Sequence, residues 1–162
     1  MLIREAEPKD VSAIHQLMID LAEHEEAAHL VESSEADLTN HLFSQNPHLF
    51  ADVAEIDGNV VGFAIWFINY STWRGKHGIY LEDLYVKPEY RGQGVGKQLL
   101  ARLAHRCIER GYGRLDWWVL NTNEIGLAFY KTLNATPMSD WTVHRIDRDA
   151  LINLANQFNQ SS

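Results

Sequence analysis

The chain has 162 residues, of which 46% are hydrophobic, and its formal net charge is −8. This length suits one domain over residues 1–162 with a buried core, and the hydrophobic content excludes a disordered chain, in which apolar residues are scarce. The acidic balance argues against nucleic-acid binding and favours small cationic partners.

Nothing in the sequence predicts export or membrane insertion. The first residues, Met1 to Glu5, lack the apolar run of a signal peptide. No segment approaches the ~18 uninterrupted apolar residues of a membrane span. The single cysteine, Cys107, cannot form an internal disulfide. These features predict a cytoplasmic protein that has no membrane partner.

In chain order, the pattern first predicts a short strand over residues 2–6 and then a helix opened by Pro8. Proline suits a first helical position because the N–H that it lacks would be unbonded there. Ser34 is the predicted N-cap of a second helix. The first helix runs to about Glu25, and its apolar residues recur at helical spacing: Val11, Ile14, Leu17, Met18 and Leu21.

Two strands joined by a hairpin turn follow, over residues 49–56 and 60–70. The second of them is too continuously apolar to face solvent on either side. A polar loop over residues 71–78 leads to a strand over residues 79–86, whose residues are β-branched, aromatic and apolar.

The apolar stripe of the next predicted helix covers residues 95–107, and the glycine-containing segment 111–113 terminates that helix. A strand over residues 114–120 and a short helix around residue 128 come next, and Asn134 suits a left-handed helix end. A strand over residues 141–146 and a helix capped by Asp147 complete the chain. The stripe of the helix over 95–107 is Val95, Leu99, Leu100, Leu103 and Cys107, which makes the cysteine a small buried hydrophobe.

A glycine-rich turn, Arg91-Gly92-Gln93-Gly94-Val95-Gly96, separates the strand over 79–86 from the helix over 95–107. The first amides of a helix lack internal partners, and glycines let that backbone approach a phosphate without a Cβ in the way. The dinucleotide pattern would need glycine at Lys97, and the nucleotide P-loop would need Ser or Thr at Gln98. The turn therefore predicts an anion site of another kind.

The pattern Arg91-x-x-Gly94-x-Gly96, with the strand before it and the helix after it, resembles the acyl-CoA-binding motif of the GCN5-related N-acetyltransferases (GNAT), Gln/Arg-x-x-Gly-x-Gly/Ala. Residues 80–86 and 90–96 are similar to the diamine (spermidine/spermine) and thialysine N-acetyltransferase subgroup. Further matches extend over nearly the whole chain: Leu21 to Glu25, Trp73 to Lys76, Asn123, Phe129 to Lys131, and Trp141. The resemblance implies the α/β GNAT fold, a mostly antiparallel central sheet with helices on both faces and a splayed parallel strand pair at the cofactor.

The resemblance also implies acetyl-CoA as the co-substrate. Backbone amides in the glycine-rich turn would cradle its diphosphate, with charge added by the side chain of Arg91. The pantetheine arm would bond like an added strand along residues 84–86, and Asn123 would contact it, unless this asparagine is a plain helix cap. The predicted cofactor-binding residues are Leu84, Tyr85, Val86, Arg91, Gly92, Gln93, Gly94, Val95, Gly96, Lys97, Asn123 and Tyr130. No metal is expected, because the eight histidines do not cluster at ligand spacing.

Two residues are the predicted catalytic groups. Tyr130 aligns with the tyrosine that the family places beside the CoA sulfur and would act as general acid, a packing tyrosine being the alternative. Glu82 and Asp83 are adjacent acids in an apolar strand, and a buried acid is costly unless it has a partner or a function. Glu82 matches the family acid that reaches the substrate amine, so we assign it general-base or amine-binding character. A structural acid is the alternative for Glu82 and the preferred reading of Asp83.

His24 and Glu25 match the substrate-side end of the first helix, although an exposed helix end is the alternative. Trp73 and Trp141 could line a channel for an alkyl amine, or could pack in the core or a dimer seam. The substrate-binding prediction is His24, Glu25, Glu82 and Trp73.

These residues together predict acetyl transfer to a primary amine of a small cationic molecule, which would be a polyamine, a diamine or a thialysine-like amino acid. The mechanism implied is direct attack in a ternary complex. The subgroup also implies a homodimer with the last strand at its interface. Two alternatives are a GNAT enzyme that acts on a protein amine or an aminoglycoside, and a non-catalytic module that binds acyl-CoA.

Overall fold

The computed structural model of the protein describes residues 1–158. These fall into two compact units, one over Met1–Trp118 and one from Val119 onward. The single domain expected over residues 1–162 stays a prediction. Among the described residues, no helix has the length and apolar content needed to cross a bilayer.

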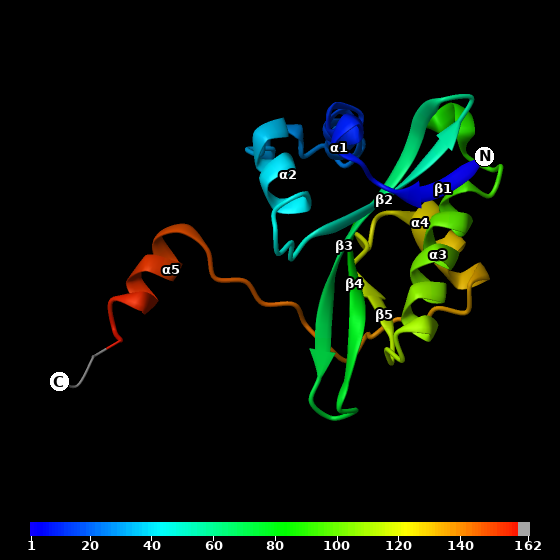
Figure 1. Ribbon diagram of the computed structural model, residues 1–162. Coiled ribbons are helices and arrows are strands. Elements are labelled where there is room, and N and C mark those ends of the chain that lie inside the picture. The colour runs from blue at the N-terminus through cyan, green and yellow to red at the C-terminus, as the bar shows by residue number, and fades with distance from the viewer. Residues whose placement is uncertain (159–162) are drawn as a thin grey trace. The chain divides into compact units, whose positions relative to one another are not determined.

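A five-stranded sheet in the order β1-β2-β3-β4-β5 organises the first unit (Figure 1). The first four strands pair antiparallel with their neighbours, and the last runs parallel to β4. This arrangement confirms the predicted fold class. The strands are β1 (Leu2–Glu5), β2 (Phe50–Ile56), β3 (Asn59–Ser71), β4 (Lys76–Val86) and β5 (Leu115–Trp117).

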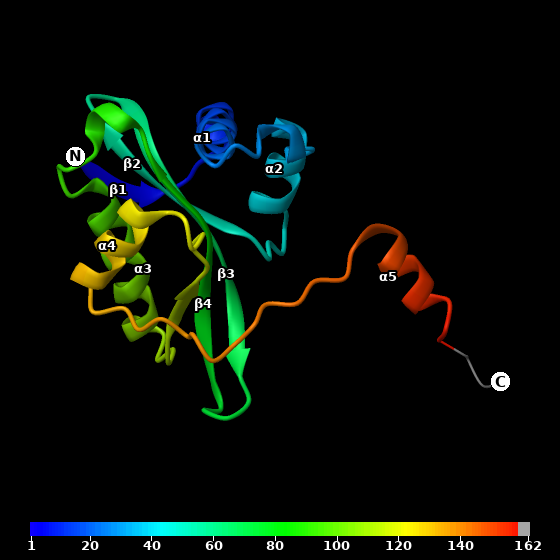
Figure 2. The ribbon, with the colours of Figure 1, turned by 180° about the vertical axis from the view of Figure 1, so that it is seen from behind.

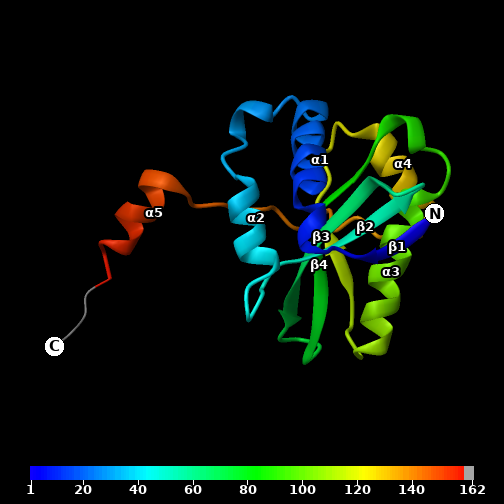
Figure 3. The same cartoon turned by 45° about the horizontal axis from the view of Figure 1, so that its top comes forward.

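Helices cover both faces of this sheet, as expected (Figure 2 and Figure 3). On one face lie α1 (Val11–His24) and α2 (Glu35–Leu42), and on the other lies α3 (Val95–Glu109). The core under α1 and α2 comprises Val11, Ile14, Leu17, Leu38, Leu42, Ala51, Val53, Phe63, Ile65 and Tyr85. The predicted stripe of α3 is buried at all five positions, which confirms it: Val95, Leu99, Leu100, Leu103 and Cys107.

Local sequence signals explain several helix ends. Pro8 opens a single 3-10 turn (Pro8–Asp10) that leads into α1. Ser34 caps α2 as predicted, because its hydroxyl accepts from the Asp37 N–H while the Asp37 carboxylate accepts from the Ser34 N–H. Asn134 has a φ of +58°, which confirms the predicted left-handed helix end.

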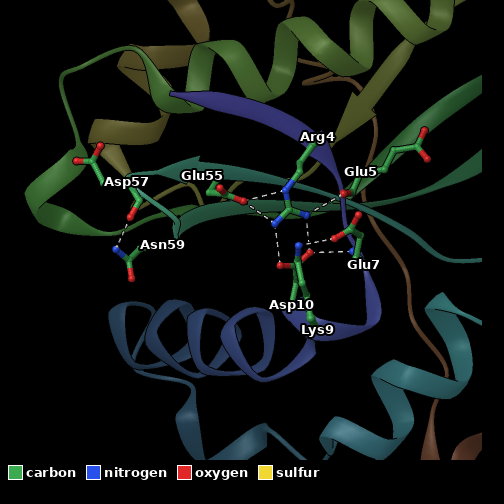
Figure 4. A network of polar contacts seen from close by, with 8 residues as sticks. All are labelled: Arg4, Glu5, Glu7, Lys9, Asp10, Glu55, Asp57 and Asn59. Carbon is green, nitrogen blue, oxygen red and sulfur yellow. Dashed lines mark hydrogen bonds and ion pairs between the residues drawn. The ribbon is translucent and has the colours of Figure 1, made fainter.

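Arg4 fixes the start of α1 to the edge of the sheet (Figure 4). Its guanidinium donates to both carboxylate oxygens of Asp10, at 2.6 and 2.9 Å, and to Glu55 on β2 at 2.7 Å. Burial acts to raise the pKa of Asp10, but hydrogen bonds from Arg4 and from the Glu7 N–H hold it below its ordinary value. The helix that ends at His24 is therefore anchored firmly at its beginning.

A β-bulge interrupts the pairing of β3 with β4. Trp66 lies opposite Leu81 and Ile65 lies opposite Asp83, so Glu82 is an extra residue with no partner across the ladder. Cross-strand partners share a face of the sheet. Because Ile65 belongs to the core under α1 and α2, Asp83 faces that side as well.

The hairpin departs from the prediction in two respects. The polar loop expected over residues 71–78 shrinks to four residues, because β3 continues to Ser71 and β4 begins at Lys76. The strand expected to be buried on both sides becomes partly exposed toward its end, where Tyr70 is 53% exposed.

The second unit contains α4 (Glu124–Thr132) and α5 (Arg148–Ala155). The strand predicted over residues 141–146 is wrong, because these residues pair with no other strand in the described chain. Their aromatic and β-branched residues have β propensity, yet a strand needs a partner to bond with. Asp147 precedes α5 as predicted, but its side chain makes no capping hydrogen bond. The strand predicted over 114–120 is cut to the three residues of β5.

Candidate functional site

The glycine-rich turn has the backbone geometry of an anion cradle. Gly92 and Gly94 have φ values of +74° and +83°, a region that side chains disfavour, and a Cβ at either position would meet nothing within 4 Å. Gly94 is the N-cap of α3, and Gln98 N donates to its carbonyl at 3.0 Å. The amides of residues 95–97 therefore precede the first bond of the helix and have no partner within it. Open space and outward amides suit a phosphate group.

Beside this turn, one edge of β4 is free. Leu84, Tyr85 and Val86 pair with β3 on one side. On the other side β5 pairs only with residues 79–81, so no described strand covers the edge of residues 82–86. An extended molecule that carries amides can add to such an edge as another strand does. The parallel pair that the resemblance implied is confirmed, and the free edge lies directly beyond it.

The side chain of Arg91 turns back onto β4. Its Nε donates to the Val86 carbonyl at 2.9 Å, and its guanidinium carbon lies 5.1 Å from the centroid of the Tyr85 ring. Gln93 likewise donates to a backbone carbonyl, that of Glu89, at 3.1 Å. The contact with Val86 thus occupies the Nε of Arg91. The charge that the Arg91 side chain is expected to add to the anion site stays a prediction.

The structure places the two adjacent acids in different environments. Glu82, on the bulge, is exposed, whereas Asp83 is partly buried. Burial, followed by the charges of Glu82 and Glu25, raises the pKa of Asp83 to about 6. No hydrogen bond or ion pair within residues 1–158 reaches the Asp83 carboxylate. Glu82 is solvated because the bulge interrupts the regular alternation of the strand. Its general-base or amine-binding role stays a prediction.

The end of α1 supplies a third carboxylate. Glu25 is the C-cap of α1, and its charge contributes to the raised pKa of Asp83. Negative charge at a helix C-terminus is unfavourable because the helix dipole is negative there. The neighbouring His24, the last residue of α1, is exposed. Glu25, Glu82 and Asp83 thus form an acidic group at the free edge of β4, whose mutual repulsion a cationic ligand would relieve.

Trp73 does not join this group within one chain. It lies in the turn between β3 and β4 and is 86% exposed. The six residue-to-residue steps from Lys76 to Glu82 span roughly 20 Å of extended strand. A contact of Trp73 with the substrate stays a prediction.

The second unit carries Asn123 and Tyr130. The side chain of Asn123 accepts from the Gly126 N–H at 2.8 Å, so the helix cap named as its alternative is present. Tyr130 lies on α4, with its ring 5.2 Å from that of Phe129. The pantetheine contact of Asn123 and the general-acid role of Tyr130 stay predictions.

Other chemistries find less support in the structure. Within residues 1–158 no three His, Cys, Asp or Glu side chains gather as metal ligands would. Cys107 lies on the buried face of α3, and burial raises the pKa of its thiol. The prediction of a small buried hydrophobe at this position is confirmed.

Comparison with known proteins identifies the family. The profile of the acetyltransferase (GNAT) family matches residues 13–135. The chain belongs to this family. A thialysine N-epsilon-acetyltransferase from Bos taurus is 36% identical over 168 residues, which cover 97% of this chain and 98% of that protein. An L-ornithine N5-acetyltransferase from Arabidopsis thaliana is 28% identical over 194 residues, covering 92% of this chain and 85% of that protein.

Solved structures agree with this assignment. An integron cassette protein from V. cholerae superposes with a TM-score of 0.79 at 27% identity, covering 96% of this chain and 98% of that one. The chain is thus an acyltransferase of the GNAT family, whose members use acetyl-CoA. The resemblance to the thialysine and spermidine/spermine subgroup is confirmed by relatives of both names.

Proposed function

We propose that this GNAT protein transfers an acetyl group from acetyl-CoA to a primary amine of a small cationic acceptor. The observation that carries the proposal is the acidic group of Glu25, Glu82 and Asp83 at the free edge of β4, directly before the glycine-rich turn. Three carboxylates with no cation among them suit a positively charged ligand.

The residues present fit acetyl-CoA. The left-handed Gly92 and Gly94 leave the space that a Cβ would fill, and the amides of residues 95–97 would hold the diphosphate. The free edge of residues 84–86 would hold the pantetheine arm. When bound, acetyl-CoA would supply the acetyl group as an activated thioester.

The residues of the chain would then manage protons and charge. An alkylammonium has a pKa of about 10, so it must lose a proton before it can attack. The Asp83 carboxylate, with a pKa of about 6, is ionised at neutral pH and can accept that proton, with Glu82 binding the amine directly or through water. A backbone N–H near Leu84 would polarise the reacting carbonyl. The Tyr130 hydroxyl would hold a proton for the leaving thiolate.

Direct attack is preferred to an acetyl-enzyme, because the sole cysteine offers no nucleophile. Cys107 lies on the buried face of α3, and its thiol has a raised pKa, whereas a nucleophilic thiol needs a lowered one.

We propose a basic amino acid with a side-chain amine as the acceptor, since the relatives named above act on thialysine and L-ornithine. A polyamine or diamine is the second candidate, because three carboxylates can bind more than one ammonium group and a relative carries a spermidine/spermine name. We further propose a cytoplasmic homodimer. In the second unit, Trp141, Val143 and Ile146 are each more than half exposed, and clustered apolar side chains mark an interface.

A screen of amines tests this function. Purified protein is mixed with acetyl-CoA and thialysine, ornithine, lysine, spermidine or an aminoglycoside, and free thiol is measured with a colorimetric reagent. We expect thiol release with thialysine or ornithine, and a loss of release in Tyr130→Phe of about a hundredfold in kcat. Calorimetric binding of CoA without turnover of any amine would indicate a non-catalytic module. A monomer mass by light scattering at micromolar concentration would contradict the dimer.

A further inference from the structure

Arg91 connects the two backbone segments of the proposed acetyl-CoA site. Val86 is the last residue of β4, and Arg91 is the first residue of the glycine-rich turn. The Arg91 Nε donates to the Val86 carbonyl at 2.9 Å. One side chain thus closes the 3-10 turn (Pro88–Tyr90) that separates the strand from the turn.

The far end of this connection is rigid. Tyr85, whose ring lies under the Arg91 guanidinium at 5.1 Å, is only 7% exposed and belongs to the core beneath α1 and α2. A cation held over an aromatic face is attracted to it. The start of the glycine-rich turn is therefore tied to a core residue as well as to the strand.

The carbonyl that Arg91 binds faces the free edge of β4. Lys87 N donates to Val61 O on β3 at 2.9 Å, so this N–H points toward β3. In a trans peptide the preceding carbonyl points the opposite way, which directs Val86 O to the uncovered side. Arg91 thereby occupies the last acceptor along the edge where the pantetheine arm would add.

We propose that Arg91 is a positioning residue that sets the register of the acyl donor. With Val86 O occupied, an added arm must pair with the groups that precede it, next to the acids. The same contact holds the glycine-rich turn at a fixed distance from that edge. This inference rests on the proposed function, because it assumes that acetyl-CoA binds along β4 and at the turn.

Two neutral variants of similar length separate the effect of the hydrogen bond that residue 91 donates from the effect of its charge. Arg91→Gln keeps an N–H donor for Val86 O, and Arg91→Met does not, so any loss of charge near the phosphates is equal in both. The donors are acetyl-CoA and S-acetylpantetheine, which has the arm but no diphosphate. Lys87→Met, which removes a cation at the same strand end, is the control for charge alone.

We expect Arg91→Met to lower kcat/KM about tenfold with both donors, mainly in kcat, and Arg91→Gln to recover most of the loss. In the protein without ligand, hydrogen exchange of residues 86–94 should be about tenfold faster in Arg91→Met than in Arg91→Gln. Lys87→Met should affect acetyl-CoA alone, and only at low salt.

Three results would each overturn the inference. The first is a loss of kcat/KM in Arg91→Met with acetyl-CoA but not with S-acetylpantetheine, which would make Arg91 a phosphate ligand. The others are equal activity of Arg91→Gln and Arg91→Met, and hydrogen exchange of residues 86–94 that is the same in both variants. Thermal unfolding of each variant shows whether it folds. If Arg91→Met does not fold, wild type and Arg91→Gln are compared in the same assays. Failure of the proposed function would show differently, as wild-type protein that neither binds CoA nor releases thiol.

Discussion

Two acids lie on opposite faces of the same sheet, and their surroundings differ completely. Asp52 on β2 is fully buried beneath α3, where it accepts from Trp66 Nε1 at 2.9 Å and from Arg106 Nη2 at 3.0 Å. Arg102 lies 3.6 Å away. Asp83 on β4 faces α1 and has two carboxylates near it instead, those of Glu82 and Glu25.

The contrast separates an acid that stabilises the fold from one that is available for chemistry. A buried charge with donors on every side holds its neighbours in place, and here it ties β2 to α3. Arg106 extends the connection to Glu5 on β1 at 2.8 Å, and this hydrogen bond lowers the pKa of Glu5. A partly buried charge without donors is unfavourable for folding, which supports the use in proton transfer proposed above for Asp83.

The largest effect is expected on the free energy of unfolding when Asp52, the acid with hydrogen-bond donors, is replaced. Asp52→Ala would leave the buried Arg106 guanidinium without one of its anions, so the free energy of unfolding at pH 7 should fall by about 4 kcal/mol. Urea unfolding followed by circular dichroism measures it. Asp57→Asn, in the exposed hairpin turn, is the control and should change it by less than about 0.5 kcal/mol. Equal effects in the two variants would remove the distinction.

When Asp83, the acid without donors, is replaced, activity and stability should change in opposite directions. Asp83→Asn should lower kcat/KM for the amine about a hundredfold. It should also raise the free energy of unfolding at pH 8 by about 2 kcal/mol, the shift being reduced for partial exposure. Asp83 has a pKa of about 6 when folded and 3.8 ordinarily. The folded state therefore binds more protons between these values, and wild-type stability falls as pH rises through that window.

Urea unfolding of wild type and Asp83→Asn at pH 3 and pH 8 checks the sign of this effect. The gain should be present at pH 8 and absent at pH 3, where the aspartate is protonated in both states. A loss of stability at pH 8 would mean that Asp83 is a paired structural acid after all.

A smaller change is expected when the nearest charge is removed. The profile of kcat/KM against pH should show a limb near pH 6 that reports Asp83. Glu82→Gln should move this limb to lower pH by about half a unit, because one like charge is lost. Steady-state rates between pH 5 and pH 9 measure it. A limb that stays in place would show that Glu82 does not interact with Asp83.

The smallest effect belongs to the end of α1. Glu25→Gln should shift the same limb downward by about 0.2 unit, since Glu25 is the weakest of the three causes of the raised pKa of Asp83. The shift should disappear in high salt. Glu26→Gln, the adjacent exposed residue, should leave the limb unmoved.

Sequence patterns predicted the parts of this protein that depend on neighbours along the chain. The stripe of α3, the Ser34 capping box and the glycine spacing after Arg91 are all local signals, and the structure has each of them. Features that depend on pairing between distant segments were out of reach. The strand expected over 141–146 has suitable residues but no partner in the described chain.

The two acids at 82 and 83 illustrate the same limit at the site. Regular alternation predicts opposite faces for two neighbouring residues, but the register of β3 against β4 inserts a bulge at Glu82. No residue type in that stretch indicates a bulge from the sequence alone. The sequence therefore identified both acids but could not predict which of them the bulge exposes. The general-base or amine-binding role of Glu82 stays a prediction.

The extra residue at Glu82 also decides which layer of the molecule receives the acid after it. With uninterrupted pairing, Asp83 would fall opposite Ala64, which itself lies opposite Asp52. Its carboxylate would then enter the layer of Arg102 and Arg106 and be neutralised there. A single supernumerary position in one strand thus keeps a reactive anion out of reach of the arginines that hold the opposite face together.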